Sequence, residues 1–589
     1  MSRLVEGVAL VRRGLLWARA HGAPAALGRA GHWLVDRRHP PSASYASWLA
    51  RRRPAATTAA PDATRPRCHL FVSVVVPVHD PEPGQLRELV ASVREQGHPR
   101  WELVLVDDAS SDPDVRAELE RVERLPGIRV DRRPRAGGIS VATNVGAAAA
   151  RGDVLVLLDH DDLLADGILE TIAAAFDADP RLDMLYTDED QLDVQGRRVA
   201  PSFKSGPSPW QLLGFNAVGH VMAVRRRLWV RLGGLRSAYD GAQDHDLALR
   251  AYEQARRVGH LPEIGYHWRR SASSVSRSAT AKPWAYAAGG RAILEAFRRR
   301  GLDLAEHGTT AWPGVWRARP RTEGELRPDV VLHGPARAMD RWEQVMRNGV
   351  QLTTGGVLRP RRVHAGSWPV AVPGALWVLH ASMAPNPTSL GALAGWAQAP
   401  GVGAAVVPLV RGARRADVGW SLHRRGRLEP ILPGLHAAAA GPGFLGAAPR
   451  QVAAGLGWLA LSQVSPGWLA ALDGRAVHAA DVLALSALPA VHEDATLLVP
   501  EGPGRSGVLR PSWPDRLARP PRRARVAALD VSSSPRWPCL RDGLPEGLWR
   551  GDVDRFCPRH ELLDAMGVPL GTAGVPWSEP TRRDRRLRV

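Results

Sequence analysis

Between Leu70 and Tyr186 the sequence alternates short apolar runs with longer amphipathic segments, and this alternation restricts the fold to few possibilities. The apolar runs have the length of buried strands, and the longer segments have helical periodicity. The expected strands are residues 71–77, 101–106, 128–131, 154–158 and 184–186, and the expected helices are residues 85–96, 115–124, 139–150 and 166–176. Repeated strand–helix units of this size predict an α/β fold, with a parallel sheet, right-handed crossovers and helices on both faces.

Residues 153–162 lead a buried strand directly into a group of carboxylates. The continuous apolar run 154–158 is typical of a central strand in a parallel sheet. Asp159 and Asp161 stand two residues apart, so on extended chain their side chains point to the same side. Paired carboxylates at the end of such a strand suit Mg²⁺ or Mn²⁺ and a ligand that carries phosphates. Taken alone, the pattern fits a polar turn after a strand better.

A second carboxylate, Asp108, follows the expected strand 101–106. Because the strands of the predicted sheet run parallel, Asp108 and Asp161 would lie at the same edge of that sheet. Acids at two neighbouring strand ends indicate a nucleotide site more strongly than either end does alone.

The composition narrows the class of partner. The 589 residues are too many for one hydrophobic core and predict about two to four domains. The net charge of +19 comes almost entirely from arginine, since lysine occurs only at Lys204 and Lys282. This charge favours anionic partners such as nucleotide phosphates or acidic lipids. The arginines are scattered, without the interleaved aromatic residues of a single-strand binding surface, so we expect no nucleic acid partner.

Three features predict a cytoplasmic location. Cys68, Cys539 and Cys557 are far apart and suggest no disulfide framework, which fits a reducing compartment. No window approaches the roughly 20 apolar residues of a membrane span. Arg12 and Arg13 interrupt the short apolar run at the start of the chain, which therefore lacks the layout of a signal peptide.

Residues 1–68 are predicted to form a basic helical arm followed by a Pro- and Ala-rich linker. Arginines recur in the arm at roughly helical spacing among apolar residues. Such an arm could lie on an anionic membrane surface, with Trp17 and Trp33 near the headgroups. Packing against the following domain explains the pattern equally well. Peripheral association with the inner face of the cell membrane therefore stays open.

An ordered set of short motifs follows the arm. The motifs are Val72-Ser-Val-Val-Val-Pro-Val78, Val106-Asp-Asp-Ala-Ser-Ser-Asp112, Gly137-Gly-Ile-Ser140, Leu158-Asp-His-Asp-Asp162, Tyr186-Thr-Asp-Glu-Asp190, Phe203-Lys204, Asn216, Gly219-His220, Gly241-Ala-Gln-Asp-His-Asp-Leu-Ala-Leu-Arg250 and Tyr266-His-Trp-Arg269. This set resembles glycosyltransferase family 2, in particular its branch for O-antigen and other surface polysaccharides, often rhamnosyltransferases. The resemblance covers roughly residues 42–310. It implies a catalytic domain over residues 69–310 with the GT-A fold, which is Rossmann-like with a mostly parallel sheet and helices on both faces.

The resemblance also implies roles for individual residues. Asp108 corresponds to the carboxylate that contacts the nucleotide base, with Pro77 and Asp80 in the loop beside it. Asp159 and Asp161 correspond to the Asp-x-Asp pair that holds the ribose–diphosphate and a divalent cation, Mg²⁺ or Mn²⁺, with Asp161 the closer metal ligand. The implied donor is a nucleotide sugar with dTDP or UDP as its nucleotide.

Three further roles fall late in the domain. Asp244 corresponds to the catalytic base and follows Gln243, where the family has Glu or Gln. His267 and Arg269 correspond to a late metal or diphosphate contact. A carboxylate of pKa about 4 cannot strip a free hydroxyl, so Asp244 would accept the acceptor's proton late, as the new bond forms. Without the resemblance, Asp244 fits an acid stabilised by the dipole at the start of a helix over 246–255.

Residues 311–505 are predicted to form a degenerate second GT-A-like domain. Residues 377–379 resemble the strand that should carry the Asp-x-Asp pair, but His380-Ala-Ser382 follows in its place. A second short alignment puts Ala480 where the first domain has its base. Residues 506–589 form a Pro- and Arg-rich C-terminal segment without a recognisable motif.

The predicted function is inverting, metal-dependent transfer of a sugar from a nucleotide sugar to a hydroxyl of a lipid-linked cell-surface glycan. One alternative is a non-catalytic glycan or nucleotide-sugar binding scaffold, although a scaffold need not keep metal ligands and base together. Another is a nucleotidyltransferase, which usually opens with a glycine-rich phosphate loop that residues 76–80 do not provide. Asp188 and Asp190 either line the acceptor side or cap a turn, and the sequence leaves both interpretations open.

Overall fold

The computed structural model describes residues 69–202, 204, 211–270, 283–309, 314, 316–333, 336–365, 375–381 and 387–399, together with Leu49 and short strands between residues 404 and 492. Several predictions concern residues outside this set. They are the N-terminal arm apart from Leu49, the whole C-terminal segment, the three cysteines and Ala480. Among the helices that are described, none is both long enough and apolar enough to cross a bilayer.

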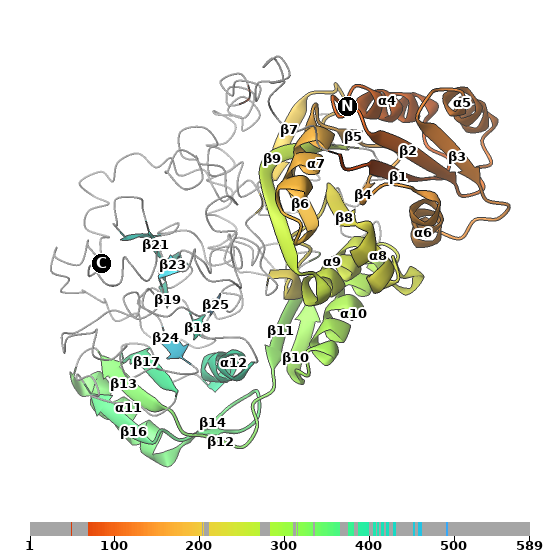
Figure 1. Ribbon diagram of the computed structural model, residues 1–589. Helices are drawn as coiled ribbons and strands as arrows, with labels where there is room; N and C mark the ends of the chain where they lie inside the picture. The colour runs from red at the N-terminus through yellow and green to blue at the C-terminus, as the bar shows by residue number, and fades with distance from the viewer. Residues whose placement is uncertain are drawn as a thin grey trace, which may run out of the picture.

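The first sheet carries its strands in the order β3-β2-β1-β4-β8-β6-β9-β5, with β7 added beside β6 (Figure 1). These strands are β1 (Val72–Val78), β2 (Trp101–Asp107), β3 (Ile128–Arg132), β4 (Val154–Leu157), β5 (Leu163–Leu164), β6 (Leu182–Leu192), β7 (Arg198–Ser202), β8 (Met222–Arg225) and β9 (Arg257–Arg269). The four strands from β3 to β4 are parallel to one another. Next, β8 runs antiparallel to both of its neighbours, β4 and β6, and β9 is parallel to β6.

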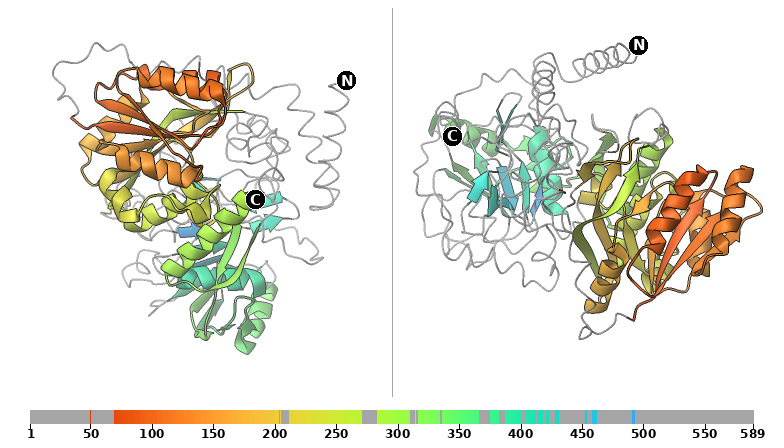
Figure 2. Two further views of the ribbon diagram at one scale, coloured as in Figure 1. Left: turned by 90° about the vertical axis from the view of Figure 1, so that its right-hand side faces the viewer. Right: turned by 90° about the horizontal axis from the view of Figure 1, so that it is seen from above.

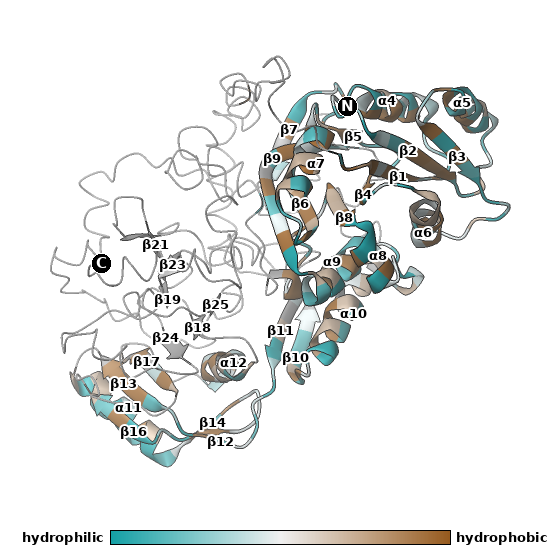
Figure 3. Cartoon of the chain, in the orientation of Figure 1, coloured by the Kyte–Doolittle hydropathy of each residue, from teal (hydrophilic) through white to brown (hydrophobic). Residues whose placement is uncertain are grey.

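Helices cover both faces of this sheet. They are α4 (Pro83–Arg94), α5 (Pro113–Glu123), α6 (Ile139–Ala149), α7 (Ile168–Ala178), α8 (Arg226–Leu232) and α9 (Gln243–Gln254). Val75 of β1 packs in one core with α6, α8 and α9, whereas Val74 and Val76 pack in another with α4, α5 and α7. Because successive strand residues point to opposite faces and both faces are buried, the strands form unbroken apolar runs in the sequence. Figure 3 shows these hydrophobic strands between helices with hydrophilic outer surfaces.

The predicted α/β fold with helices on both faces is confirmed, but the sheet is parallel only as far as β4 and mixed beyond it. The antiparallel pairing of β8 with β4 determines which residues lie near the acids that follow β4. Met222, the first residue of β8, pairs with Leu157, the last residue of β4. The segment that precedes β8 therefore lies next to the acids that follow β4.

Gly152 lets two backbone segments approach closely just before β4. A Cβ atom here would lie 2.6 Å from the nitrogen of Ser73 and 2.8 Å from the carbonyl oxygen of Phe71, both main-chain atoms that cannot move without displacing β1. We expect Gly152→Ala to lower the free energy of unfolding by about 1–3 kcal/mol, the usual cost of overpacking, as measured by chemical denaturation. Gly84→Ala in α4 is the control, because its Cβ would meet only the flexible Glu82 side chain, at 3.4 Å. Equal losses for the two variants would contradict this account.

A hairpin of β10 (Leu304–Thr309) and β11 (Trp316–Pro320) leads from α10 (Pro283–Arg299) to a second sheet. The strand order of this sheet is β16-β13-β17-β24-β18-β25. Its strands are β13 (Asp329–His333), β16 (Arg362–Ala365), β17 (Leu376–His380), β18 (Ala404–Val407), β24 (Trp458–Leu461) and β25 (Ala490–His492), and its helices are α11 (Ala336–Asn348) and α12 (Pro387–Gln398). The pairing directions and the chain order match those of β2-β1-β4-β8-β6-β9 one for one. The second half therefore repeats the topology of the first.

The repeated register locates the counterpart of the acidic stretch. Val72 pairs with Val154 in the first sheet, and Asp329 pairs with Leu376 in the second. Asp159 follows Val154 by five residues, and Ala381 follows Leu376 by the same number, so Ala381 takes the place of Asp159. This register agrees with the sequence alignment that put His380-Ala-Ser382 after the degenerate strand. The boundaries 311–505 stay a prediction.

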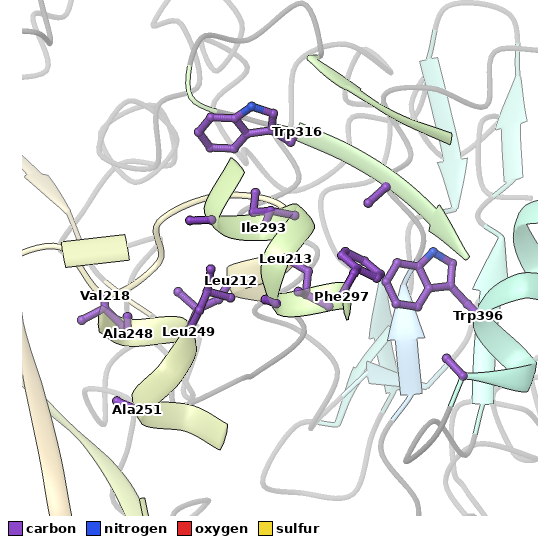
Figure 4. Packing of buried hydrophobic residues seen from close by; sticks show 14 of the residues in the cluster. Leu212, Leu213, Val218, Ala248, Leu249, Ala251, Ile293, Phe297, Trp316 and Trp396 are labelled. Carbon is purple, nitrogen blue, oxygen red and sulfur yellow. The ribbon is translucent and has the colours of Figure 1, made fainter. Parts of the chain in front are cut away.

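The two halves share one hydrophobic core. Phe297 of α10 packs on Trp396 of α12, with ring centroids 5.9 Å apart, and Trp316 of β11 lies 5.9 Å from the ring of His245 in α9. Figure 4 shows Phe297, Trp316 and Trp396 together with apolar residues of α9 and α10. Figure 2 shows the two sheets as separate lobes. The second half thus contacts the helix that carries the candidate base.

Candidate active site

Asp159 and Asp161 lie just beyond β4, at the carboxyl edge of the first sheet. β4 ends at Leu157, and residues 160–161 form a turn where the sequence had suggested extended chain. The N–H of Asp162 donates to the carbonyl of Asp159 at 3.3 Å. The two predicted carboxylates are therefore brought near each other by a turn, and strand alternation plays no part. We call residues 159–162 the acidic turn.

Asp162, which the sequence did not single out, anchors the acidic turn from inside the protein. Its side chain is fully buried, and its carboxylate accepts the Tyr266 hydroxyl at 2.6 Å and the main-chain N–H of Arg269 at 2.7 Å. Burial raises the pKa of Asp162 well above its ordinary value, and the carboxylates of Asp161 and Asp159 raise it further. Burial also raises the pKa of Tyr266 well above its usual range. These contacts attach the turn to β9.

Asp159 is more open, with 38% of its side chain exposed, and its Oδ2 lies 3.7 Å from Nε2 of His220. Desolvation by the surrounding protein raises the pKa of Asp159. His220 lowers this pKa, while the carboxylates of Asp161 and Asp244 raise it. Carboxylates that disfavour one another's charge in this way are stabilised by a nearby cation. The oxygen-only donor set of the turn therefore fits Mg²⁺ or Mn²⁺.

The structure does not group His267 with the acidic turn as a third metal ligand. Nδ1 of His267 lies 2.5 Å from Oδ1 of Asp190 on β6, the kind of carboxylate support that metal-binding histidines often have. Its neighbours Tyr266 and Trp268 both contact the ring of His220, so His267 points to the opposite face of β9. Across the described ranges, no three His, Cys, Asp or Glu side chains are arranged to hold a metal. Diphosphate oxygens and water would have to complete the coordination.

Arg269 supports the acidic turn from behind. Its Nε donates to the carbonyl of Asp161 at 2.9 Å, and one terminal nitrogen donates to the carboxylate of Glu88 on α4 at 2.6 Å. Only 17% of the arginine side chain is exposed. The predicted contact with the donor's diphosphate would require the guanidinium to give up Glu88.

Asp244 lies in the first turn of α9, which begins at Gln243, earlier than the sequence suggested. The side-chain amide of Asn216 donates to Oδ2 of Asp244 at 2.6 Å. The amide oxygen of Asn216 accepts the N–H groups of Val218 and Gly219, both at 3.3 Å. One asparagine therefore orients both the candidate base and the loop that leads into β8. The position of Asp244 is also compatible with the helix-dipole interpretation.

Asp159 and Asp244 line the same pocket. His220 and Gln243 contribute to its polar lining, and Pro77 lies at its edge. The apolar lining comes from Val75, Ile139, Leu157, Leu158, Met222 and Leu235. The pocket thus brings one carboxylate of the acidic turn and the candidate base into one space.

Asp80 and Asp108 bind the loops that follow β1, β2 and β3 to one another. The buried carboxylate of Asp108 accepts the N–H groups of Gly137 and Gly138, at 2.8 to 3.0 Å, and pairs with Arg133. The carboxylate of Asp80 accepts two N–H groups and one hydroxyl from residues 111–112. These hydrogen bonds, that of the Asp112 N–H foremost, lower the pKa of Asp80. The predicted contacts of both acids with the nucleotide stay a prediction.

Asp188 and Asp190 are both fully buried in β6. Oδ1 of Asp188 accepts the N–H of Lys204 at 2.8 Å and lies 2.7 Å from Nε2 of His260. Asp190 contacts His267 and Arg198. Since neither carboxylate reaches the surface, the structure favours a structural role over a contact with the acceptor.

The sequence assigned no role to Asn216, His220 or Tyr266. All three occur in the motif set, so their place in its order was the available signal. Their positions beside the acids depend on how β8 and β9 pair in the sheet.

The mixed sheet, the acidic turn after β4 and the carboxylate at the start of α9 together form a candidate active site in an α/β domain. Residues 73–230 match the family model of glycosyl transferase family 2, and this part of the chain belongs to that family. The chain therefore carries a family 2 glycosyltransferase domain.

The chain is similar to two bacterial proteins over part of its length. It is 43% identical to "O-antigen biosynthesis protein RfbC" of Myxococcus xanthus over 297 residues, which are 50% of this chain and 23% of that protein. It is 39% identical to "Uncharacterized protein y4gI" of Sinorhizobium fredii over 232 residues, which are 39% of this chain and 26% of that protein. The chain thus spans about a quarter of the length of these curated relatives. Among solved structures, S. aureus TarS 1–349 with UDP-GlcNAc aligns over 39% of this chain and 72% of its own, at 20% identity and a TM-score of 0.31.

Proposed function

We propose that this chain is an inverting, metal-dependent glycosyltransferase that moves a sugar from a nucleotide sugar to a hydroxyl of a lipid-linked cell-surface glycan. The observation that carries the proposal is the shared pocket of Asp159 and Asp244 within a family 2 domain. Asp159 belongs to a turn whose carboxylates suit a cation and a diphosphate. Asp244 lies at the start of a helix, half-exposed, where an acceptor hydroxyl can reach it.

In this mechanism Asp244 acts as the general base. The acceptor oxygen attacks the anomeric carbon, the bond from that carbon to the diphosphate oxygen breaks, and the hydroxyl proton passes to the carboxylate of Asp244. A single displacement of this kind inverts the anomeric centre and forms no covalent intermediate. Proton transfer comes late, because an ordinary carboxylate is too weak a base for a free hydroxyl. Asn216 holds the carboxylate in position through its hydrogen bond.

The acidic turn holds the departing diphosphate. Asp159 and Asp161 would bind Mg²⁺ or Mn²⁺, which neutralises charge that builds on the diphosphate as it leaves. The anchoring contacts of Asp162 with Tyr266 and Arg269 keep the turn in place, so its carboxylates need little reorganisation during the reaction.

The substrates follow from the family and from the relatives. A family 2 domain supports a nucleotide-sugar donor, for which we propose UDP or dTDP as the nucleotide. The relative from Myxococcus xanthus is named for O-antigen biosynthesis, which supports a surface glycan as the acceptor. We propose that the reaction takes place in the cytoplasm, at the inner face of the membrane.

A non-catalytic role is favoured for the second half alone. Its sheet repeats the topology of the first, but Ala381 takes the place of Asp159. Without a carboxylate at that position, the second sheet lacks the ligand that a cation and diphosphate would need there. Glycan binding without sugar transfer fits this half better than nucleotide-sugar binding does.

The test of the function is a donor screen with the full chain. The purified protein is incubated with UDP-glucose, UDP-N-acetylglucosamine, dTDP-glucose and dTDP-rhamnose, with Mn²⁺ or Mg²⁺ and then with EDTA. We expect release of the nucleoside diphosphate from a subset of donors, and loss of this release in EDTA. Absence of both binding and release for every nucleotide sugar would refute the proposal. Equal release with and without the metal would refute its metal dependence.

A further inference from the structure

Lys204 is unusual in this chain. Of the 78 basic side chains only Lys204 and Lys282 are lysines, and Lys204 is the one that lies within the described residues. It is also buried, with 7% of its side chain exposed. Burying an ammonium group is costly unless it is paired and hydrogen-bonded, so a lysine at such a place indicates a specific contact.

The contacts of Lys204 converge on the main chain of His220. Nζ of Lys204 donates to Oε2 of Glu189 at 2.9 Å and to the carbonyl oxygen of His220. The N–H of His220 donates to the same Oε2 of Glu189, also at 2.9 Å. The buried pair therefore holds both polar groups of the His220 backbone. We call Lys204 and Glu189 the His220 clamp.

The geometry of the clamp requires a small cation and a small neighbour. The ammonium of lysine is compact, whereas the guanidinium of arginine is planar and larger. Gly219 has φ of +51°, and a Cβ atom there would lie 2.9 Å from Oε2 of Glu189 and 3.2 Å from Nζ of Lys204. Because space around the clamp is this tight, arginine at position 204 could not take the place of lysine without displacing the loop.

The ring of His220 is fixed as firmly as its backbone. It stacks on the ring of Tyr266, with centroids 4.8 Å apart and an interplanar angle of 18°, and meets Trp268 edge-on at 6.4 Å. Its Nε2 points to within 3.7 Å of Oδ2 of Asp159, and 24% of its side chain is exposed. The imidazole lines the same pocket as Asp159 and Asp244. It thus lies beside the acidic turn, in the pocket that the candidate base also lines.

We propose that His220 contacts the transferred sugar and that the His220 clamp positions it, an inference that rests on the proposed function. If Asp159 belongs to the diphosphate site and Asp244 receives the acceptor's proton, the transferred sugar occupies the pocket between them. A polar group fixed in that pocket hydrogen-bonds a sugar hydroxyl and selects among donors. His220 is then a specificity-determining residue, and Lys204 and Glu189 are positioning residues.

The experiment compares the affinity for nucleotide sugars with that for nucleoside diphosphates. UDP-glucose, UDP-N-acetylglucosamine, dTDP-glucose and dTDP-rhamnose are titrated into the full chain with Mn²⁺, alongside UDP and dTDP. For the sugar that the wild type binds, we expect His220→Ala to raise Kd about 10-fold, the loss of one hydrogen bond. The Kd of the matching diphosphate should stay within about 2-fold, because the proposal places the imidazole at the sugar and the diphosphate at the acidic turn.

The clamp variants are expected to reproduce the same selective loss. Lys204→Met and Lys204→Arg should both weaken nucleotide-sugar binding while sparing the diphosphate, and Glu189→Gln should do so to a lesser degree. The control is Asp183→Asn, which removes the charge of a buried aspartate that pairs with Arg227 and Arg256 at the other end of β6. It should lower stability without changing the ratio of the two affinities.

Three outcomes would overturn the inference. Equal weakening of sugar and diphosphate binding in His220→Ala would place the imidazole at the diphosphate. If the ratio of nucleotide-sugar to diphosphate affinity is unchanged in both Lys204→Met and Glu189→Gln, the clamp does not position His220. Glu189→Gln alone still tests this point if Lys204→Met fails to fold. Failure of the wild type to bind any of the six nucleotides would refute the proposed function itself, and the inference with it.

Discussion

Asp244→Asn is expected to reduce sugar transfer by about 10²–10⁴-fold, the usual contribution of a general base, while nucleotide-sugar binding stays nearly intact. Asparagine keeps an oxygen that can accept the hydrogen bond from Asn216, so the pocket should keep its shape. What is lost is the ability to take up the acceptor's proton. The measurement pairs the transfer rate, followed as nucleoside diphosphate release in the presence of acceptor, with donor affinity by calorimetry.

The helix-dipole interpretation of Asp244 gives a different result. An acid in the first turn of a helix stabilises the fold by typically 0.3–1 kcal/mol and contributes nothing to transfer. Asp114→Asn is the matched control, because Asp114 is an exposed acid in the first turn of α5, away from the pocket. Transfer at a near-normal rate in Asp244→Asn, with a small stability loss like that of Asp114→Asn, would show that Asp244 is not the base.

Asp161→Ala is expected to remove metal-dependent nucleotide binding, with a fall of about 10²-fold or more in the affinity for UDP or dTDP in Mn²⁺. The acidic turn offers few protein ligands, since no cluster of three suitable side chains exists among the described residues. Losing one carboxylate should therefore be poorly compensated. Binding is measured with Mn²⁺ and with EDTA, and the variant in Mn²⁺ should resemble the wild type in EDTA.

The control for Asp161→Ala is Asp166→Ala, which removes an exposed acid shortly after the turn. It changes the local charge equally but leaves the turn and its anchor Asp162 untouched. Comparable losses in the two variants would indicate general electrostatics and no metal ligation. If the wild type binds UDP or dTDP with equal affinity with and without the metal, Asp161 is not a metal ligand for nucleotide binding.

Much of the first domain was predictable from local sequence patterns. The apolar runs at β1, β2 and β4 are continuous because both faces of these strands are buried, and this is a property that a short window of sequence carries. The acids that follow β2 and β4 were correctly placed at one edge of the sheet, because parallel strands end at a common edge. The degenerate second copy was likewise visible as a strand without its acids, and the second sheet repeats the expected topology.

The arrangement of side chains around the acids was less accessible. The sequence suggested that Asp159 and Asp161 share one side of extended chain, whereas a turn anchored by Asp162 brings them near each other. His267 was expected beside this pair, yet it lies against Asp190 on the other face of β9. Both differences arise from contacts between residues that are far apart in the sequence, by 104 and 77 positions. The periodicity of a short window carries no information about such contacts.

The sequence by itself determined the order of the main strands and helices from β1 to β6, the family that this part of the chain resembles, and the acids on which its chemistry would depend. These follow from local burial patterns and from the spacing of short motifs. Only the tertiary structure decided which residues surround those acids. Because β8 enters antiparallel between β4 and β6, its first residue pairs with the last residue of β4, and Asn216 and His220 come to lie beside Asp244 and Asp159. Strand pairing is a long-range choice, set by which surfaces bury one another.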